Sequence, residues 1–482
     1  MSKPDVEDLS SELLLIAGRR LSGSADAVTL HYPGTGMPTR DVRLATAADV
    51  GAAVECACAA FPTWRGLAPS VRRDMMLKAA ELLVQRADRL GRVAAVDSGL
   101  TVENVKGFVR HASEWLKYYA GWIDKAGGPT VPMAADAMDY VRYEPYGVIG
   151  VISPSNSSVS AMILAPLLAA GNCAVIKPSE FNAQVTAEYL QVFLDAGFPP
   201  GVVNSVPGGA AAGEALIRHK GITKVHFTGS CAVGAKVGAL AASLFKPCAL
   251  ELGGKSANIV FSDADLDGAA TIATRALVRQ TGQSCVAGTR IIVHESVADE
   301  VLARTVELTR QQKVGLPLAA DTAVGPVVSA AACSRIMGTI EEARTKGYGR
   351  LVLGGDRVGG SLAGGYFVNP AIFADVDNAG PLAQREIFGP VISFITFRSD
   401  EEAIALANAS DFGLAAYIHT SSLRRAHNTA ANLDVGTIWI NGAAGILPGG
   451  PFGGFKESGW GRVGGFEGFS EFVRPKNVWV AL

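Results

Sequence analysis

Apolar side chains recur every three to four residues between residues 46 and 122, a period that places them on one face of an α-helix. The predicted helices are Asp49–Trp64, Ser70–Ala95 and Val102–Trp122. Glycines interrupt this pattern at Gly91 and Gly99, where we expect breaks or ends of helices. The first part of the chain is therefore predicted to be mostly helical.

After Tyr146 the pattern changes to short β-branched runs that alternate with helical stretches. The predicted strands are Val148–Ile152, Cys173–Ile176, Val202–Val206 and Ile222–Phe227, and the helices between them are Val159–Ala170, Ala183–Ala196 and Ala211–His219. Strand–helix–strand alternation is typical of parallel strands joined by right-handed crossovers. The pattern predicts a doubly wound α/β sheet.

A second alternation begins after Gly254. Its predicted strands are Asn258–Phe261, Arg290–His294, Ile392–Phe397, Ala415–His419 and Thr437–Ile440, with helices at Leu266–Gln280 and Glu401–Ala409. The segments Lys125–Tyr143 and Phe469–Leu482 fit neither alternation but hold strand-like pieces, of a kind that often pairs with another chain. We expect an α/β protein with two doubly wound domains and a small β element.

Composition agrees with a large globular protein and excludes several classes. Of the 482 residues, 49% are hydrophobic and 18% charged, which suits a large core and argues against disorder. A net charge of −2 gives no basic surplus for nucleic acid or an anionic membrane. The longest apolar stretch, Ala161–Ile176, is interrupted by Pro166, Gly171 and Asn172, so we expect a buried segment and no membrane partner.

Cysteine and histidine usage indicates neither disulfides nor metal. The seven cysteines are irregularly spaced, which fits free thiols in a reducing compartment, and the cytoplasm is the expected location. Cys56 and Cys58 have no second pair or histidine cluster near them in the sequence, so no zinc site is expected.

One cysteine stands between glycines at the end of a predicted helix, in Gly282-Gln283-Ser284-Cys285-Val286-Ala287-Gly288. Flanking glycines let the backbone come close to a substrate and present its N–H groups. A thiol in such a turn is a candidate nucleophile if its pKa is lowered. From this heptamer alone, a buried structural cysteine is the alternative.

Two polar side chains are candidates for the same chemistry. Glu251 begins Glu251-Leu252-Gly253-Gly254-Lys255, predicted to be an open, mobile loop, and is either a general base or an ordinary loop carboxylate. Asn156 follows a strand end in Val151-Ile152-Ser153-Pro154-Ser155-Asn156. Its amide can donate to a developing oxyanion or cap a helix, and both can hold at once.

Two strand ends carry groups suited to a nucleotide. In Lys177-Pro178-Ser179-Glu180 the charged side chains can bind ribose hydroxyls, or form a solvated pair in a turn. Phe227-Thr228-Gly229-Ser230 leads from a strand into a helix, where a pyrophosphate can sit at the helix N-terminus. It lacks the G-x-G-x-x-G spacing, so alone it is a weak dinucleotide signal.

Taken in chain order, these five segments resemble the aldehyde dehydrogenase superfamily, and the distance from Glu251 to Cys285 resembles the family's own. Further similar motifs are Tyr366-Phe367-Val368-Asn369-Pro370, Glu386-Ile387-Phe388-Gly389-Pro390, Asn441-Gly442 and Pro451-Phe452-Gly453-Gly454-Phe455-Lys456-Glu457-Ser458-Gly459. The resemblance extends from about Thr46 to the end of the chain.

The resemblance implies an enzyme that oxidises an aldehyde to the carboxylic acid with NAD. Cys285 would attack the aldehyde, Asn156 would hold the oxyanion, and Glu251 would activate the water that hydrolyses the thioester. Lys177 and Glu180 would bind the adenosine ribose and Glu386 the nicotinamide ribose, with Phe388 beside the ring. The other residues expected at the cofactor are Ser153, Pro154, Ser179, Phe227, Thr228, Gly229, Ser230, Leu252 and Gly253.

The expected substrate tunnel departs from the family pattern. Many members have Pro-Trp-Asn-Phe-Pro where this chain has Pro154-Ser155-Asn156-Ser157-Ser158, so two aromatic residues and a proline are missing. By resemblance, the tunnel walls are Ser157, Ala161, Leu164, Ser284, Val286, Ile446 and Phe452. Small residues on one wall predict a wide tunnel and a bulky hydrophobic aldehyde, aromatic or terpenoid.

Alternatives remain for the cofactor and the reaction. The charge of Glu180 would repel a 2′-phosphate, which favours NAD, with NADP as the alternative. A CoA-acylating semialdehyde dehydrogenase is a second candidate, although Glu251 as hydrolytic base argues against it. A non-catalytic binding protein on the same fold is a third, and the presence of Cys285, Glu251 and Asn156 argues against that.

The resemblance also implies a division of the chain. We expect a NAD-binding domain at 1–124 and 144–250, a catalytic domain at 251–440, and a segment at 441–464 that lines the tunnel and bridges the domains. The pieces 125–143 and 465–482 would form an oligomerisation element, so a homodimer or homotetramer is expected.

Overall fold

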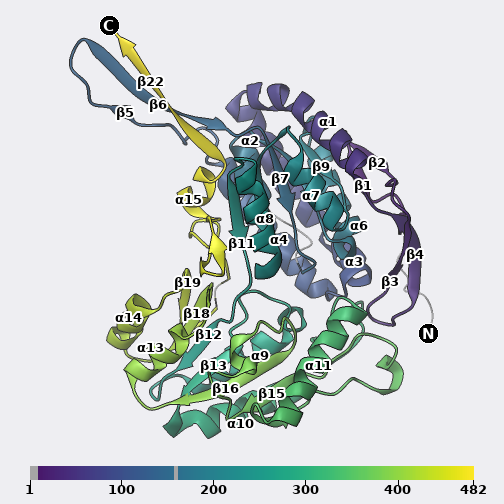
Figure 1. The fold of residues 1–482 in the computed structure, drawn as a ribbon, viewed down its shortest axis with the longest axis vertical. Coiled ribbons are helices and arrows are strands. Elements are labelled where there is room, and N and C mark those ends of the chain that lie inside the picture. Colours follow the sequence, from purple (N-terminus) through teal and green to yellow (C-terminus); the bar gives the residue numbers. More distant parts are fainter. Residues whose placement is uncertain (1–8, 157–160, 444) are drawn as a thin grey trace.

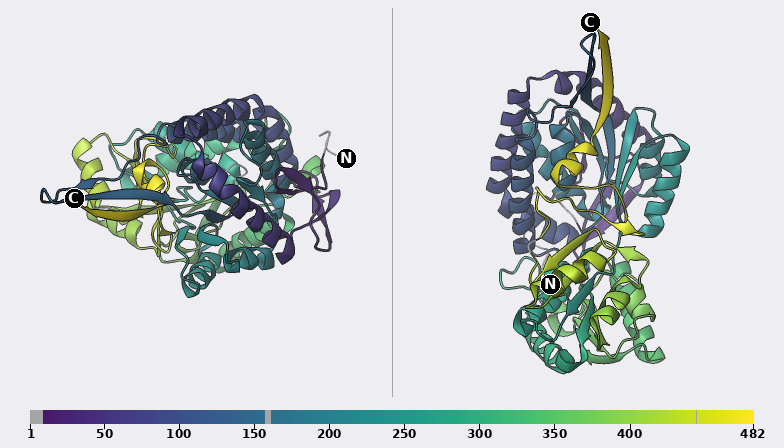
Figure 2. Two further views of the ribbon diagram at one scale, coloured as in Figure 1. Left: turned by 90° about the horizontal axis from the view of Figure 1, so that it is seen from above. Right: turned by 90° about the vertical axis from the view of Figure 1, so that its left-hand side faces the viewer.

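The structure is a computed structural model that describes residues 9–156, 161–443 and 445–482. It has two large sheets, each covered by helices, and a thin β extension that projects from the upper part of the molecule (Figures 1 and 2). Within the described ranges, no helix is both long and apolar enough to span a bilayer.

The first sheet has eight strands in the order β2-β1-β9-β8-β7-β10-β11-β21. Its central strands from β9 to β11 are parallel, and β1 and β21 pair antiparallel at the two sides. The strands are β1 (Leu14–Ile16), β2 (Arg19–Leu21), β7 (Val148–Ile152), β8 (Cys173–Lys177), β9 (Val203–Ser205), β10 (Ile222–Thr228), β11 (Cys248–Glu251) and β21 (Gly459–Trp460).

Helices around this sheet fall into two packed groups. Helix α1 contacts α7, which contacts α8, whereas α2, α3, α4, α5 and α6 pack on one another. Their bounds are α1 (Ala47–Gly66), α2 (Pro69–Gln85), α3 (Ala87–Ser98), α4 (Val102–Ala120), α5 (Ala161–Ala169), α6 (Ala183–Asp195), α7 (Ala210–Arg218) and α8 (Cys231–Ser243). Strands buried on both faces explain the continuous apolar run of Val148–Ile152.

The second sheet has seven strands in the order β14-β15-β16-β13-β12-β18-β19, all parallel except β14. The strands are β12 (Ala257–Val260), β13 (Arg290–His294), β14 (Arg350–Leu353), β15 (Ala371–Ala374), β16 (Val391–Phe397), β18 (Ala415–His419) and β19 (Thr437–Ile440). The helices of this unit are α9 (Leu266–Val278), α10 (Ala298–Arg310), α11 (Ala330–Lys346), α12 (Pro381–Gln384), α13 (Asp400–Asn408) and α14 (Leu423–Asn432).

The projecting extension is an antiparallel sheet in the order β22-β6-β5 (Figure 1). It joins β5 (Thr130–Val131) and β6 (Ala137–Pro145) to the C-terminal β22 (Val473–Ala481). Short elements complete the chain: β3 (Ala27–His31), β4 (Pro38–Arg43), β17 (Phe412–Gly413), β20 (Phe455–Lys456), α15 (Gly465–Ser470), and the 3₁₀ turns η1 (Glu180–Asn182), η2 (Arg279–Gly282), η3 (Glu295–Val297) and η4 (Gly360–Leu362).

The two expected α/β alternations are confirmed, with two local corrections. The predicted helix Ser70–Ala95 is divided into α2 and α3 at Arg86, which leaves helical geometry at φ −96° and ψ 7°. The expectation of a break at Gly91 is therefore wrong, because Gly91 is buried within α3, whereas Gly99 does end that helix in the left-handed conformation. Glu251, expected in an open and mobile loop, ends β11 and is only 7% exposed.

Candidate active site

The two large units meet at a cavity of about 710 Å³. Cys285, Glu251 and Asn156, the three residues predicted to carry the chemistry, all line it. They arrive from separate elements: the turn after α9, the end of β11 and the loop after β7. The fold therefore brings together three groups that are far apart in the sequence.

The turn that carries Cys285 has an uncommon backbone. Gln280, Thr281 and Gly282 follow one another at φ of 53°, 56° and 70°, and a β-branched residue such as Thr281 is strained at positive φ. Hydrogen bonds hold the turn: the Thr281 hydroxyl donates to the Gly325 oxygen at 3.0 Å, and the backbone N–H of Val328 donates to Gln283 Oε1 at 3.0 Å. Strain retained in this way is typical of a functional site.

Asn156 is fastened to that turn. Its side-chain Nδ2 donates to the backbone oxygen of Gln283 at 2.9 Å, and Gln280 Nε2 donates to the backbone oxygen of Asn156 at 2.7 Å. An amide nitrogen carries two hydrogens, so one remains for a ligand near Cys285. This geometry suits the stabilisation of an oxyanion on a group bonded to the sulfur.

Glu251 is a buried carboxyl without a fixed partner. Neither of its carboxyl oxygens has a hydrogen-bond partner among the described residues. Burial raises the pKa of Glu251 well above 4.5, although the nearby Arg462 guanidinium opposes the rise. A carboxyl whose pKa is shifted toward neutrality can serve as a general base.

The surroundings of Cys285 favour its protonated thiol form. Burial, followed by the charges of Glu386 and Glu251, raises the pKa of Cys285 to about 12. The residue is nonetheless only partly buried and lines the cavity, which a substrate can enter. A reaction at Cys285 consequently needs a base that removes the proton and donors that stabilise the product of attack.

Gly253 and Gly254 allow the backbone to approach both Glu386 and the cysteine turn. A Cβ at Gly253 would lie 2.3 Å from Glu386 Oε2, and a Cβ at Gly254 would lie 2.7 Å from the backbone oxygen of Cys285. The N–H of Gly254 donates to Glu386 Oε1 at 3.3 Å. Phe388, at a positive φ of 52°, lines a small recess together with Glu386 and Ser284. Glu386 is thereby brought beside the cysteine turn.

The remaining predicted cofactor residues lie at one edge of the first sheet, where β8, β7 and β10 end as neighbouring parallel strands. Ligands of doubly wound sheets bind at such carboxyl ends. The residues at this edge or in the loops that follow it are Ser153, Pro154, Lys177, Ser179, Glu180, Phe227, Thr228, Gly229 and Ser230, and Leu252 follows the end of β11. The Lys177 ammonium donates to the Gly208 oxygen at 2.6 Å, and the Ser179 hydroxyl donates to Glu180 Oε2 at 3.1 Å.

The start of α8 fits a pyrophosphate. Ser230 makes no side-chain capping bond, which leaves N–H groups of the first turn without a side-chain acceptor. A Cβ at Gly234 would lie 2.4 Å from the Leu252 side chain, so the glycine lets α8 pack against the end of β11. The buried Thr228 hydroxyl also has no partner among the described residues. These features accommodate a dinucleotide at this edge.

The tunnel prediction is only partly matched by the cavity. Ala161, Ser284, Val286, Ile446 and Phe452 line the cavity, whereas Ser157 lies outside the described residues.

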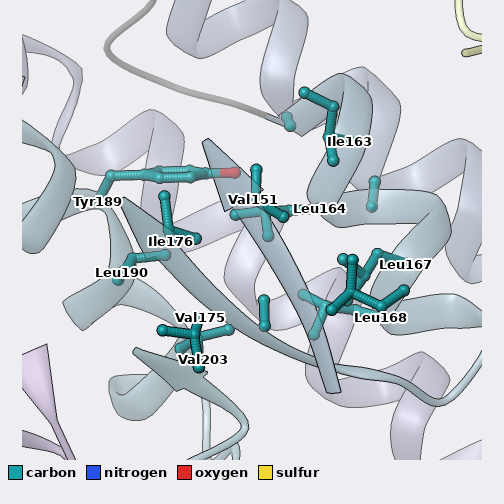
Figure 3. Close-up of a cluster of buried hydrophobic side chains, with 14 of the residues drawn as sticks. Val151, Ile163, Leu164, Leu167, Leu168, Val175, Ile176, Tyr189, Leu190 and Val203 are labelled. Atoms are coloured by element: carbon teal, nitrogen blue, oxygen red, sulfur yellow. The ribbon is translucent and has the colours of Figure 1, made fainter. Parts of the chain in front are cut away.

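The prediction for Leu164 is wrong. This side chain is fully buried and packs with Val151, Leu167 and Leu168 in the core (Figure 3). The cavity meets the beginning of α5, through Ala161, Met162 and Ile163, and does not follow one side of the helix.

Several cavity residues were not predicted from the sequence. Phe108 and His111 come from α4, Arg279 follows α9, and Tyr417 and Trp439 come from β18 and β19. The rings of Tyr417 and Trp439 stack, with their centroids 5.0 Å apart and their planes at 28°. No single-chain signal distinguishes these residues from core aromatics, because their exposure depends on where the two units meet.

Comparison with known proteins gives one consistent family. The model of the aldehyde dehydrogenase family matches residues 21–478. An aldehyde dehydrogenase of Aspergillus niger is 40% identical over 451 residues, which covers 92% of this chain and 90% of the relative.

Solved structures agree along nearly the full length. The NAD+ complex of an aldehyde dehydrogenase from Bacillus cereus has a TM-score of 0.94 and 35% identity, with coverage of 97% of this chain and 96% of that chain. An indole-3-acetaldehyde dehydrogenase from P. syringae, a mutant solved with NAD+ and IAA, has a TM-score of 0.94 and 36% identity, with the same two coverages.

Proposed function

The chain belongs to the aldehyde dehydrogenase family, and from that premise we propose that it oxidises an aldehyde to the carboxylic acid, with NAD+ as oxidant, through a covalent intermediate on Cys285. It is an NAD-dependent enzyme, as its NAD+-bound structural relatives support. The observation that carries the proposed mechanism is the convergence of Cys285, Glu251 and Asn156 on one cavity.

In the proposed reaction, the Cys285 sulfur bonds to the aldehyde carbon after its proton has been removed. The free amide hydrogen of Asn156 and the backbone N–H of Cys285 stabilise the resulting oxyanion, each by about 3 kcal/mol. NAD+ supplies the hydride acceptor that the oxidation requires. Glu251 then takes a proton from water, whose attack on the thioester releases the acid and restores the thiol.

The cofactor would be held by groups of this chain with complementary chemistry. Glu386 would bind one ribose beside Cys285, and Lys177 and Glu180 the other, while the start of α8 would hold the pyrophosphate. Glu180 supports NAD over NADP, since its charge would repel a 2′-phosphate.

We propose a bulky hydrophobic aldehyde as substrate. Support comes from the size of the cavity, about 710 Å³, and from its apolar wall of Met162, Ile446 and Phe452. A similar structure is that of an enzyme named for indole-3-acetaldehyde, an aromatic aldehyde.

A substrate panel with active-site variants tests this function. We expect NADH formation with aromatic or terpenoid aldehydes at a higher kcat/KM than with acetaldehyde. Cys285→Ala should abolish turnover, and Glu251→Gln should give a burst of NADH followed by slow hydrolysis, with the acyl adduct visible by intact-protein mass spectrometry.

Unchanged turnover in Cys285→Ala would refute the mechanism. An acetaldehyde optimum would refute the substrate class, and a requirement for CoA would favour the acylating alternative.

The β extension supports a homo-oligomer. Strand β22 is nine residues long and forms the edge of its three-stranded sheet, with its other side unpaired among the described strands. Met138, Trp479 and Val480 expose apolar side chains on this extension. A free strand edge with exposed apolar groups favours pairing with a second copy.

A further inference from the structure

Arg279 places a positive charge in the cavity wall without a matching negative charge. It directly follows α9, is half-buried, and lies over the ring of Phe108 with its guanidinium carbon 5.7 Å from the centroid. Within residues 9–156, 161–443 and 445–482, no carboxylate forms an ion pair or hydrogen bond with it. Its charged neighbour is a second cation, Arg275, one helical turn earlier.

The two carboxyl groups that reach the cavity do not neutralise Arg279. Glu103 is exposed and bonded to Lys106 Nζ at 3.1 Å. Glu251 lies at the end of β11, makes no hydrogen bond or ion pair with Arg279 in the described structure, and its pKa is raised by burial, which disfavours its charged form. A cation in a largely apolar wall is costly unless an anion pairs with it. The missing anion is therefore most simply supplied by a ligand.

The surroundings of Arg279 suit a flat apolar body that ends in an acceptor. Phe108 and the stacked pair of Tyr417 and Trp439 provide aromatic surface in the same cavity. His111 also lines it, and its Nε2 accepts from Trp115 Nε1 at 2.8 Å. An indole N–H can only donate, so the neutral imidazole carries its proton on Nδ1 and has one further donor.

We propose that the substrate carries a carboxylate as well as the aldehyde, on an aromatic or other apolar body, and that Arg279 binds this carboxylate while Cys285 attacks the aldehyde. This inference rests on the proposed function and narrows its substrate class. One hydride passes to NAD+ and one water is consumed, so the products are a dicarboxylate, NADH and two protons. Guanidinium–carboxylate pairs are strong because two parallel N–H bonds can form.

A matched pair of aldehydes tests the proposal. 4-Formylbenzoate and its methyl ester share ring and aldehyde and differ in charge. We expect the parent enzyme to show the higher kcat/KM with the acid. Arg279→Gln should lower the acid-to-ester ratio of kcat/KM by about 10- to 100-fold, because a hydrogen-bonded charge pair is lost. Arg279→Lys should retain part of the preference.

Arg310→Gln is the matched control, since Arg310 is exposed at the end of the neighbouring α10 and does not line the cavity. It should leave the ratio unchanged. A parent that prefers the ester, or a ratio unaltered in Arg279→Gln, would overturn the inference and leave the dehydrogenase function intact. If Arg279→Gln does not fold, the preference of the parent enzyme for the acid or for the methyl ester alone tests the proposal. A parent that oxidises no aldehyde of any class would instead contradict the proposed function itself.

Discussion

The side-chain amide of Gln280 lies 2.7 Å from the backbone oxygen of Asn156 and donates to it. Asn156 in turn donates to the backbone oxygen of Gln283 at 2.9 Å. These two bonds fix the loop after β7 against the strained turn before Cys285. The position of the proposed oxyanion donor relative to the sulfur therefore depends on Gln280, a residue that contributes no chemistry of its own.

Replacing Gln280 by alanine should reduce kcat more than it reduces stability. Loss of one hydrogen bond costs about 1 kcal/mol of folding free energy. A displaced Asn156 should lower kcat by about 10- to 100-fold, because small misplacements of catalytic groups are expensive. Stopped-flow NADH formation and chemical denaturation measure the two effects.

Gln311→Ala is the control for that experiment, because Gln311 is exposed at the C-terminal cap of α10 and its side-chain amide bonds only to Glu307, at 3.0 Å, in the described structure. An unaltered kcat in Gln280→Ala would show that the turn holds Asn156 without this bond.

The sequence predicted the two alternations and the three central residues, and the physical reason is local. Parallel strands buried on both faces, such as Val148–Ile152, leave an apolar run that is readable without context. Glu251 and Cys285 could be proposed as candidates because glycines and polar groups interrupt such runs. Their spacing also resembled a known family.

What the sequence did not reveal depends on packing between distant elements. Leu164 and Met162 are both apolar residues of α5, and only the place where the cavity meets that helix decides which is exposed to it. Arg279 resembles any helix-terminal cation until the absence of a partner among the described residues is visible. Similarly, the burial of Glu251 follows from its position at the end of a paired strand, β11.

Replacing Glu251 by glutamine should stabilise the protein at neutral pH. The folded-state pKa of Glu251 is raised above 4.5, so between about pH 4.5 and that higher value the unfolded chain releases a proton that the folded chain retains. The parent thus loses stability as pH rises through this window, by up to about 1.4 kcal/mol per pH unit. Glu251→Gln lacks this loss, so its free energy of unfolding should exceed that of the parent by an amount that grows with pH and vanishes below pH 4.5.

Urea denaturation at several pH values measures this difference. Glu81→Gln is a suitable control because Glu81 is exposed on α2. A constant difference between Glu251→Gln and the parent across the pH range would show that Glu251 ionises in the folded protein as it does in the unfolded chain.

A methyl group at Gly253 should weaken cofactor binding. The added Cβ would lie 2.3 Å from Glu386 Oε2, so the carboxylate must move from its position beside Cys285. If Glu386 binds the nicotinamide ribose, Gly253→Ala should raise the Kd for NAD+ by about tenfold, the loss of one charged hydrogen bond. Fluorescence titration of each variant with NAD+ measures this Kd.

Gly51→Ala provides the comparison, since a Cβ at Gly51 in α1 meets no atom within 4 Å. That variant should bind NAD+ normally and gain about 0.5–1 kcal/mol of stability, as alanine is favoured over glycine inside a helix. Equal NAD+ affinity in both variants would argue against a cofactor role for Glu386.

Assembly should depend on the exposed edge of β22. Trp479 is 56% exposed and lies opposite Asp139 of β6, so Trp479→Lys removes an apolar contact surface while it places a favourable charge pair within the sheet. We expect the parent to scatter light as a dimer or larger, and Trp479→Lys to shift toward the mass of one chain at micromolar concentration, because lysine on an edge strand opposes strand pairing. Phe245→Lys is the control: Phe245 is 95% exposed, lies just after the end of α8 and is not part of the β extension, so this variant should keep the parental mass. A monomeric parent, or an equal mass in both variants, would exclude this edge as the site of assembly.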